Sequence, residues 1–106
     1  MTATRPLPSD TSIKEAGTYV ICSTPPGIEI LFEWAATGNF GATILYRGPD
    51  GKLEPLRDEV TERVIDLKWK AGSRRLRVGC EGKLYLMVNL EKDTVIKIRH
   101  IRITNS

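Results

Sequence analysis

Residues 28–34 read IEILFEW, and their alternation decides the fold. The large apolar side chains occupy every second position, at Ile28, Ile30, Phe32 and Trp34. In a strand these side chains share one buried face, and Glu29 and Glu33 lie on the other, which we expect to be solvated. The two carboxylates are about 13 Å apart along a strand. That distance is too long for the paired-carboxylate chemistry of glycosidases.

The same alternation recurs in other segments, and turn signals separate them. Apolar residues recur at every second position in residues 42–46, against Thr43 and Arg47, and in residues 76–80, against Arg75, Arg77 and Gly79. The turns are TPPG (24–27), TGNFG (37–41), GPDG (48–51), AGS (71–73), EG (81–82) and EKD (91–93). This spacing predicts an all-β fold, an antiparallel β-sandwich of the jelly-roll or Ig-like kind with about eight short strands.

Two segments predict finer features of the sheets. Residues 84–88 (LYLMV) are apolar on both faces, which places this strand in the centre of a sheet or under a neighbouring chain. In residues 94–104 the apolar residues change phase between Ile98 and Ile101. We expect a β-bulge near Arg99 and His100 to restore the register.

The segment from Arg57 to Lys70 has two interpretations. Val60, Val64 and Leu67 recur at helical spacing, with acidic residues first and lysines last. Alternation over residues 63–69 and its β-branched residues favour a strand. A helix would make the fold a sandwich with one helical crossover.

The length of 106 residues is enough for one domain. Residues 1–10 contain Pro6 and Pro8 without an apolar period, which predicts an extended N-terminal arm beside a single domain over residues 11–106. We expect deletion of residues 2–10 to leave folding intact and to weaken assembly. The N-terminus also lacks the apolar stretch of a signal peptide.

Residues that carry chemistry are few in this sequence. His100, the one histidine, is flanked by Arg99 and Arg102 and is expected at a bulge or rim. Cys22 and Cys80 are either reduced core residues or a pair, if their strands are neighbours. No zinc-ligand spacing, DxDxDG loop, GxSxG elbow or phosphate-binding loop occurs. We therefore expect no catalytic residues, no metal, no cofactor and no enzymatic activity.

Charge is segregated along the chain, whose formal net charge is +3. Residues 54–66 hold five anions, and residues 68–77 hold five cations without an anion. This pattern fits complementary rims of identical subunits or solvated faces, and it also fits a nucleic-acid-binding face. Trp69 lies in the basic stretch but alternates with Ile65 and Leu67, so we expect it in the core or in an interface.

Residues 39–90 form a pattern of turns and strands. NFGATILYRGPDGKLEPL is followed by a polar connection and then by VIDLKWKAGSRRLRVGCEGKLYLMVNL. This pattern resembles small β-sandwich structural proteins of tailed-bacteriophage particles, of the capsid cement, decoration or head–tail accessory type. The acidic connection at residues 57–62 is longer and more charged than in that pattern.

The resemblance implies a non-enzymatic virion subunit, made in the host cytoplasm, that decorates or cements the capsid. Its expected partners are identical subunits and a major capsid or other virion protein, with neither nucleic acid nor membrane. The alternative is a carbohydrate- or nucleic-acid-binding β-sandwich module. The residues expected at interfaces are Arg5, Pro6, Leu7, Pro8, Glu54, Asp58, Glu59, Glu62, Arg74, Arg75 and Arg77.

Overall fold

The fold was analysed in a computed structural model, which describes residues 5–24, 27–57, 61, 63–65, 67, 70–78 and 81–103. These residues form nine strands and no helix. The strands are β1 (Arg5–Pro6), β2 (Asp10–Ile13), β3 (Gly17–Thr24), β4 (Ile28–Ala36), β5 (Phe40–Arg47), β6 (Leu53–Pro55), β7 (Ala71–Val78), β8 (Gly82–Leu90) and β9 (Ile96–Ile103). A search of the same residues finds no helix of the length and hydropathy that a membrane span requires.

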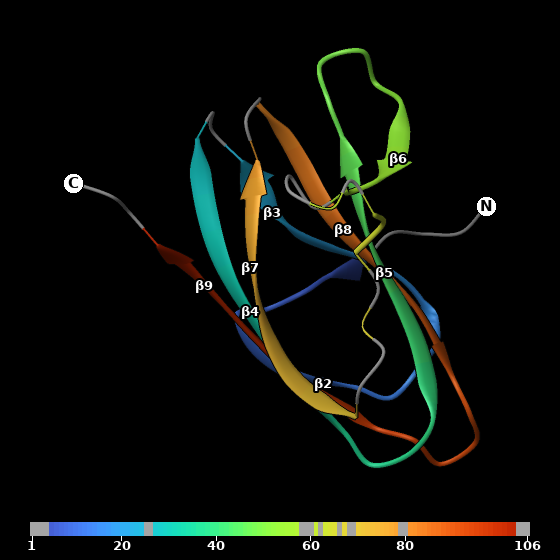
Figure 1. Ribbon diagram of the computed structural model, residues 1–106. Helices are drawn as coiled ribbons and strands as arrows, with labels where there is room; N and C mark the ends of the chain where they lie inside the picture. Colours follow the sequence, from blue (N-terminus) through green and yellow to red (C-terminus); the bar gives the residue numbers. More distant parts are fainter. Residues whose placement is uncertain are drawn as a thin grey trace.

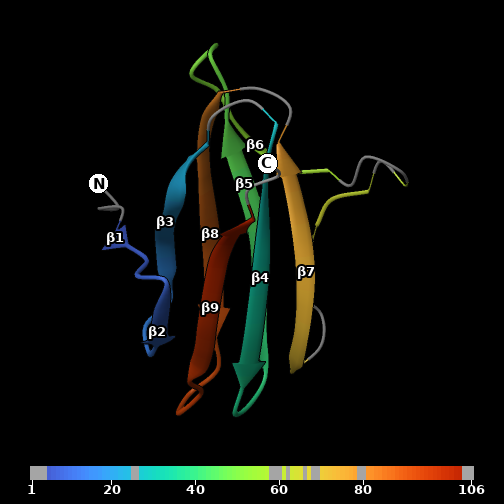
Figure 2. The same cartoon turned by 90° about the vertical axis from the view of Figure 1, so that its left-hand side faces the viewer.

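The strands form two sheets packed face to face, as predicted. The five-stranded sheet has the order β1-β3-β8-β5-β6, and the four-stranded sheet has the order β2-β9-β4-β7 (Figure 1). Figure 2 shows the four-stranded sheet with its strands side by side. All pairings between these strands are antiparallel except that of β1 with β3. The β-sandwich expectation is thus confirmed.

The core lies between the sheets and follows from the alternation in the sequence. The predicted inward residues of β4 are all buried, with Phe32 0% and Ile30 1% exposed. The strand at residues 84–88 belongs to β8, which lies in the middle of the five-stranded sheet, as predicted. Its inward residues Leu84, Leu86 and Val88 belong to the same core.

The last strand differs from the prediction, because it contains no bulge. The pairing of β9 with β4 runs without a shift from Glu29 opposite Ile103 to Ala36 opposite Ile96. Continuous pairing leaves Ile101 on the outer face of the sheet, where it is 40% exposed. The shift in register lies in β3 instead, between Val20 and Cys22.

No described residue of 57–70 is helical, which favours the strand interpretation over the helix. Ile65 and Leu67 are 3% and 2% exposed, so both alternate into the core. The amide of Ile44 donates to Ile65 O (3.2 Å), and the amide of Leu67 donates to Ala42 O (3.0 Å). Regular pairing is limited to one bridge between Arg57 and Val64. Trp69 lies outside the described residues.

The described residues of the N-terminal segment lie along the sandwich and take part in both sheets. β1 pairs with β3, and β2 pairs with β9. Between them Leu7 is 5% exposed and belongs to the core, and its amide donates to Val20 O (2.8 Å). Residues 5–10 are therefore paired with the sandwich and contribute to its core.

Candidate interaction surfaces

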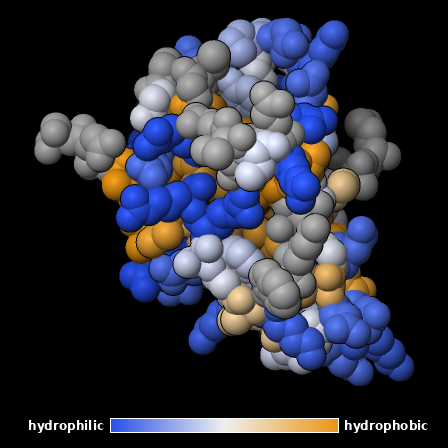
Figure 3. Space-filling view, viewed as in Figure 1, coloured by the Kyte–Doolittle hydropathy of each residue, from blue (hydrophilic) through white to orange (hydrophobic). Residues whose placement is uncertain are grey.

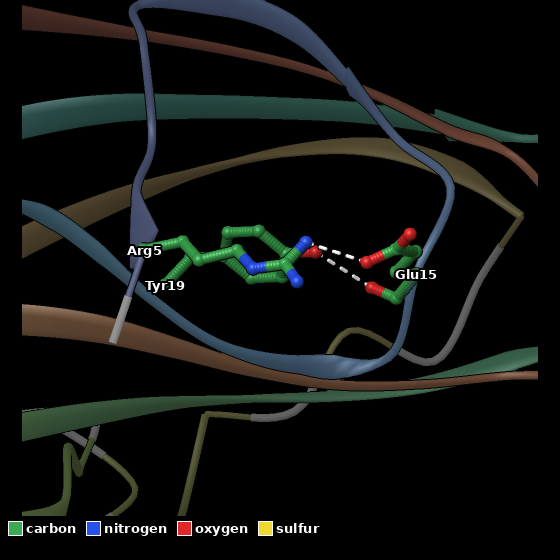
Figure 4. Close-up of polar contacts among 3 residues, drawn as sticks. All are labelled: Arg5, Glu15 and Tyr19. Carbon is green, nitrogen blue, oxygen red and sulfur yellow. Dashed lines mark hydrogen bonds and ion pairs between the residues drawn. The ribbon is translucent and has the colours of Figure 1, made fainter. Parts of the chain in front are cut away.

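The predicted N-terminal interface residues divide into three exposed residues and one core residue. Arg5, Pro6 and Pro8 are exposed, whereas the side chain of Leu7 is buried in its own domain. Arg5 Nη1 donates to Glu15 Oε2, and the hydroxyl of Tyr19 donates to the Glu15 carbonyl oxygen (2.7 Å, Figure 4). The hydrogen bond to the Glu15 carboxylate raises the pKa of Arg5 above its ordinary value. Arg5 is thus held by its own chain.

Of the predicted acidic residues, Glu54 alone falls in the described part of the chain. It is exposed on β6, the last strand of the five-stranded sheet, and lies opposite Tyr46. Asp58, Glu59 and Glu62 lie outside the described residues. Their expected role at an interface stays a prediction.

The predicted basic residues lie on β7, the edge strand of the four-stranded sheet. Arg75 Nη1 is 3.7 Å from Glu29 Oε1, and Arg77 Nη2 is 3.9 Å from Glu29 Oε2. Glu29 is 8% exposed, which corrects the expectation of a solvated carboxylate. Because a buried carboxylate requires positive partners, two of the three arginines compensate a charge within their own chain. Arg74 is half-buried and lies opposite Phe32.

The outer face of the four-stranded sheet combines these charges with aliphatic side chains. Leu31 lies between Arg75 of β7 and Ile101 of β9, in a row across three strands. Figure 3 shows hydrophobic surface interleaved with strongly hydrophilic side chains on the side where β4, β7 and β9 lie in Figure 1. The phase change in the sequence of the last strand therefore produces an outer face on which apolar and charged side chains are mixed.

The outer face of the five-stranded sheet carries a row of apolar side chains. Register places four residues in one row across β3, β8, β5 and β6: Val20, Tyr85, Leu45 and Pro55, called here the outer row. Tyr85 is 6% and Leu45 8% exposed, although neither belongs to the core cluster. The guanidinium carbon of Arg47 lies 5.5 Å from the centroid of the Tyr85 ring, in cation–π contact.

Two exposed apolar side chains flank the outer row. Met87 and Leu53 are each 42% exposed. Sequence reasoning identified the apolar outer side of β8 but missed its neighbour Leu45. The run Ile44-Leu45-Tyr46 is apolar at adjacent positions, and this signal identifies a second strand with two apolar faces.

The residues with catalytic side chains have structural roles where they are described. His100 Nε2 is 2.9 Å from Leu7 O, and the His100 amide donates to Ser9 O (2.9 Å). Cys22 carries a free, half-buried thiol, and Cys80 is outside the described residues. No group of three or more His, Cys, Asp or Glu side chains gathers as a metal site within the described ranges.

Comparison with known proteins gives no family or relative from which a function can be transferred. No family model matches the chain, and no curated protein matches it. Inference about its role therefore depends on its own surfaces.

Proposed function

We propose that this chain is a non-enzymatic structural subunit that decorates or cements a phage virion through contacts between protein subunits. Its contact surface is the outer face of the five-stranded sheet, centred on the outer row. The primary partner is a second copy of the same chain. The virion context is supported by the resemblance over residues 39–90.

The observation that carries the proposal is the exposure of two apolar side chains, Met87 and Leu53, on the side of the sheet that faces away from the core. A sheet with one solvated face has polar residues on that face. Here an aromatic and an aliphatic side chain lie next to each other, with exposed Met87 and Leu53 beside them. Apolar and aromatic side chains at the centre of a surface, with charged groups at its rim, are typical of protein interfaces.

The aromatic residues favour this function over carbohydrate binding. A carbohydrate-binding surface presents exposed aromatic rings to the sugar. In the part of the chain that the structure describes, Tyr19, Phe32, Trp34 and Tyr85 are buried, and Phe40 and Tyr46 are half-buried. This distribution favours a protein contact through an apolar patch over carbohydrate binding through exposed aromatic rings.

Sedimentation velocity over a range of protein concentrations tests the proposal. Met87→Glu places a charge on the proposed surface and is expected to abolish self-association, because an unpaired charge is costly in an apolar contact. Ile101→Glu is the matched control, since Ile101 is 40% exposed on the outer face of the other sheet, against 42% for Met87. This control is expected to associate like the wild type.

Circular dichroism checks that both variants are folded. A wild-type chain that stays monomeric at every concentration overturns self-association. Equal loss of self-association in Met87→Glu and Ile101→Glu overturns the assignment of the contact to the five-stranded sheet. Binding to glycan arrays by the isolated monomer would favour the carbohydrate module instead. Nucleic-acid binding that weakens steeply with salt would favour the other alternative.

A further inference from the structure

A cavity of about 600 Å³ lies where the end of β3, the end of β5 and the start of β8 meet the end of β9. We propose that this cavity, called here the basic cavity, binds a small organic molecule through a phosphate monoester group. Arg47, Lys83 and Arg102 would bind the phosphate. The proposal goes beyond the structural function above and does not depend on it, although the cavity shares Tyr85 with the outer row.

The first observation is that the three cations come from different strands and line one cavity. Arg47 and Lys83 lie opposite each other on β5 and β8, and Arg102 comes from β9 of the other sheet. None of the three forms an ion pair with a carboxylate of the described residues. Like charges that share a site without forming ion pairs repel one another, and a bound anion reduces this repulsion.

The second observation is a buried hydroxyl on a residue that lines the same cavity. Thr24 lines the cavity and is 1% exposed. Its Oγ1 has no hydrogen-bond partner in the described part of the chain. A buried hydroxyl without a partner has an energetic cost, and a ligand oxygen that accepts its hydrogen bond would remove that cost.

Charge and size together indicate the class of ligand. The three cations and Glu81, which also lines the cavity, give a formal net charge of +2. This charge matches a phosphate monoester, which approaches −2 above its second pKa of about 6. Arginine offers a planar fork of donors suited to phosphate oxygens. The volume falls in the range of small-molecule sites, about 300–1,000 Å³, and leaves room for an organic group beside Tyr85.

A titration with phenyl phosphate, followed by two-dimensional NMR of backbone amides, tests the proposal. We expect saturable shifts at Lys83 and Gly82 and none at Lys92. Lys92 is exposed in the turn after β8, and the end of that strand at Leu90 is about 23 Å from Lys83 at the rise of a strand. Benzoate and phenyl sulfate are the comparison ligands. Each carries one negative charge, so we expect each to bind about tenfold or more weakly than the dianion.

Three variants test the assigned residues, with Lys92→Met as the control for loss of one positive charge. Lys83→Met and Arg102→Gln are each expected to weaken phenyl phosphate binding by about tenfold, because each removes a charged hydrogen-bond donor. Thr24→Val keeps the shape of the side chain and removes the hydroxyl, and an affinity loss of about fivefold is expected. Lys92→Met is expected to bind like the wild type, because its charge lies well beyond a screening length of about 8 Å.

The outcomes separate this proposal from general attraction of anions. Absence of saturable shifts at Lys83, or equal binding of benzoate and phenyl phosphate, overturns it. Equal weakening by Lys92→Met and Lys83→Met overturns it too, since the effect would then follow net charge alone. Unchanged affinity in Thr24→Val overturns the role of that hydroxyl. Because Arg102 belongs to the other sheet, loss of binding in Arg102→Gln with self-association intact separates this cavity from the outer row.

Discussion

His100 Nε2 lies 2.9 Å from the carbonyl oxygen of Leu7, although the two residues are 93 positions apart in the chain. The carbonyl oxygen accepts, so the ring nitrogen that faces it carries the hydrogen. The backbone amide of the same histidine donates to Ser9 O. The last strand therefore holds the N-terminal segment at two points, one on each side of Pro8, and fixes Leu7 over the core.

Replacement of Leu7 by alanine is expected to lower the free energy of unfolding by about 2–3 kcal/mol, as for other buried leucines. Pro8→Ala is the control, because Pro8 is exposed in the same segment. Chemical denaturation measures both. For the same reason deletion of residues 2–10 is now expected to destabilise the fold. A deletion variant as stable as the full chain would contradict this integration.

Gly82 is expected to tolerate no side chain, because a Cβ at this position would overlap the carbonyl oxygen of Arg47 and lie 2.6 Å from Tyr46 Cε2. Gly82→Ala should lower the free energy of unfolding by about 2–3 kcal/mol through overpacking against backbone. Gly41→Ala on the neighbouring strand is the control, since nothing lies within 4 Å of its Cβ position. Thermal denaturation of the pair checks this contrast, and equal melting temperatures would show that β8 moves away from β5 without cost.

Local alternation predicted the fold well wherever a strand has one face in the core. The period of two in β4 is visible within seven residues, and the two apolar faces of β8 are visible within five. The first ten residues offer no such period. Their pairing depends on β3 and β9, which lie far along the chain, and local sequence does not report that contact.

The phase change in β9 had two physical solutions, a bulge or an apolar residue on the outer face. The chain adopts the second solution, and the apolar side chain of Leu31 lies opposite Ile101 on the outer face.

The surface sites were harder to predict, because their residues come together only in the folded chain. Arg47, Lys83 and Arg102 lie far apart in the sequence, whereas the basic residues of 68–77 lie close together and are easily recognised as a cluster. Within that cluster, Arg75 and Arg77 are engaged with Glu29 from another strand.

Glu29→Gln is expected to lower the free energy of unfolding by about 1 kcal/mol at low ionic strength, because it removes the anion shared by Arg75 and Arg77. The loss is small because both guanidinium groups are more than half exposed and can be rehydrated. Glu33→Gln on the same face of β4 is the control and should change stability less. Urea denaturation at low and high salt measures the difference, which should shrink as salt screens the pairs. Equal effects of the two substitutions would refute the pairing.

Cys22 is expected to react slowly with thiol reagents at neutral pH. Burial raises the pKa of its thiol above the ordinary value, and nearby Arg102 offsets part of that shift. The thiolate is the reactive form, so a raised pKa moves the increase in alkylation rate to higher pH than in a free cysteine. Arg102→Gln should move it higher still, because the positive charge that favours the thiolate is lost. Alkylation rates against pH in a Cys80→Ser background measure both shifts. A profile in the Arg102→Gln variant that moves to lower pH, or does not move, would show that the guanidinium does not act on this thiol.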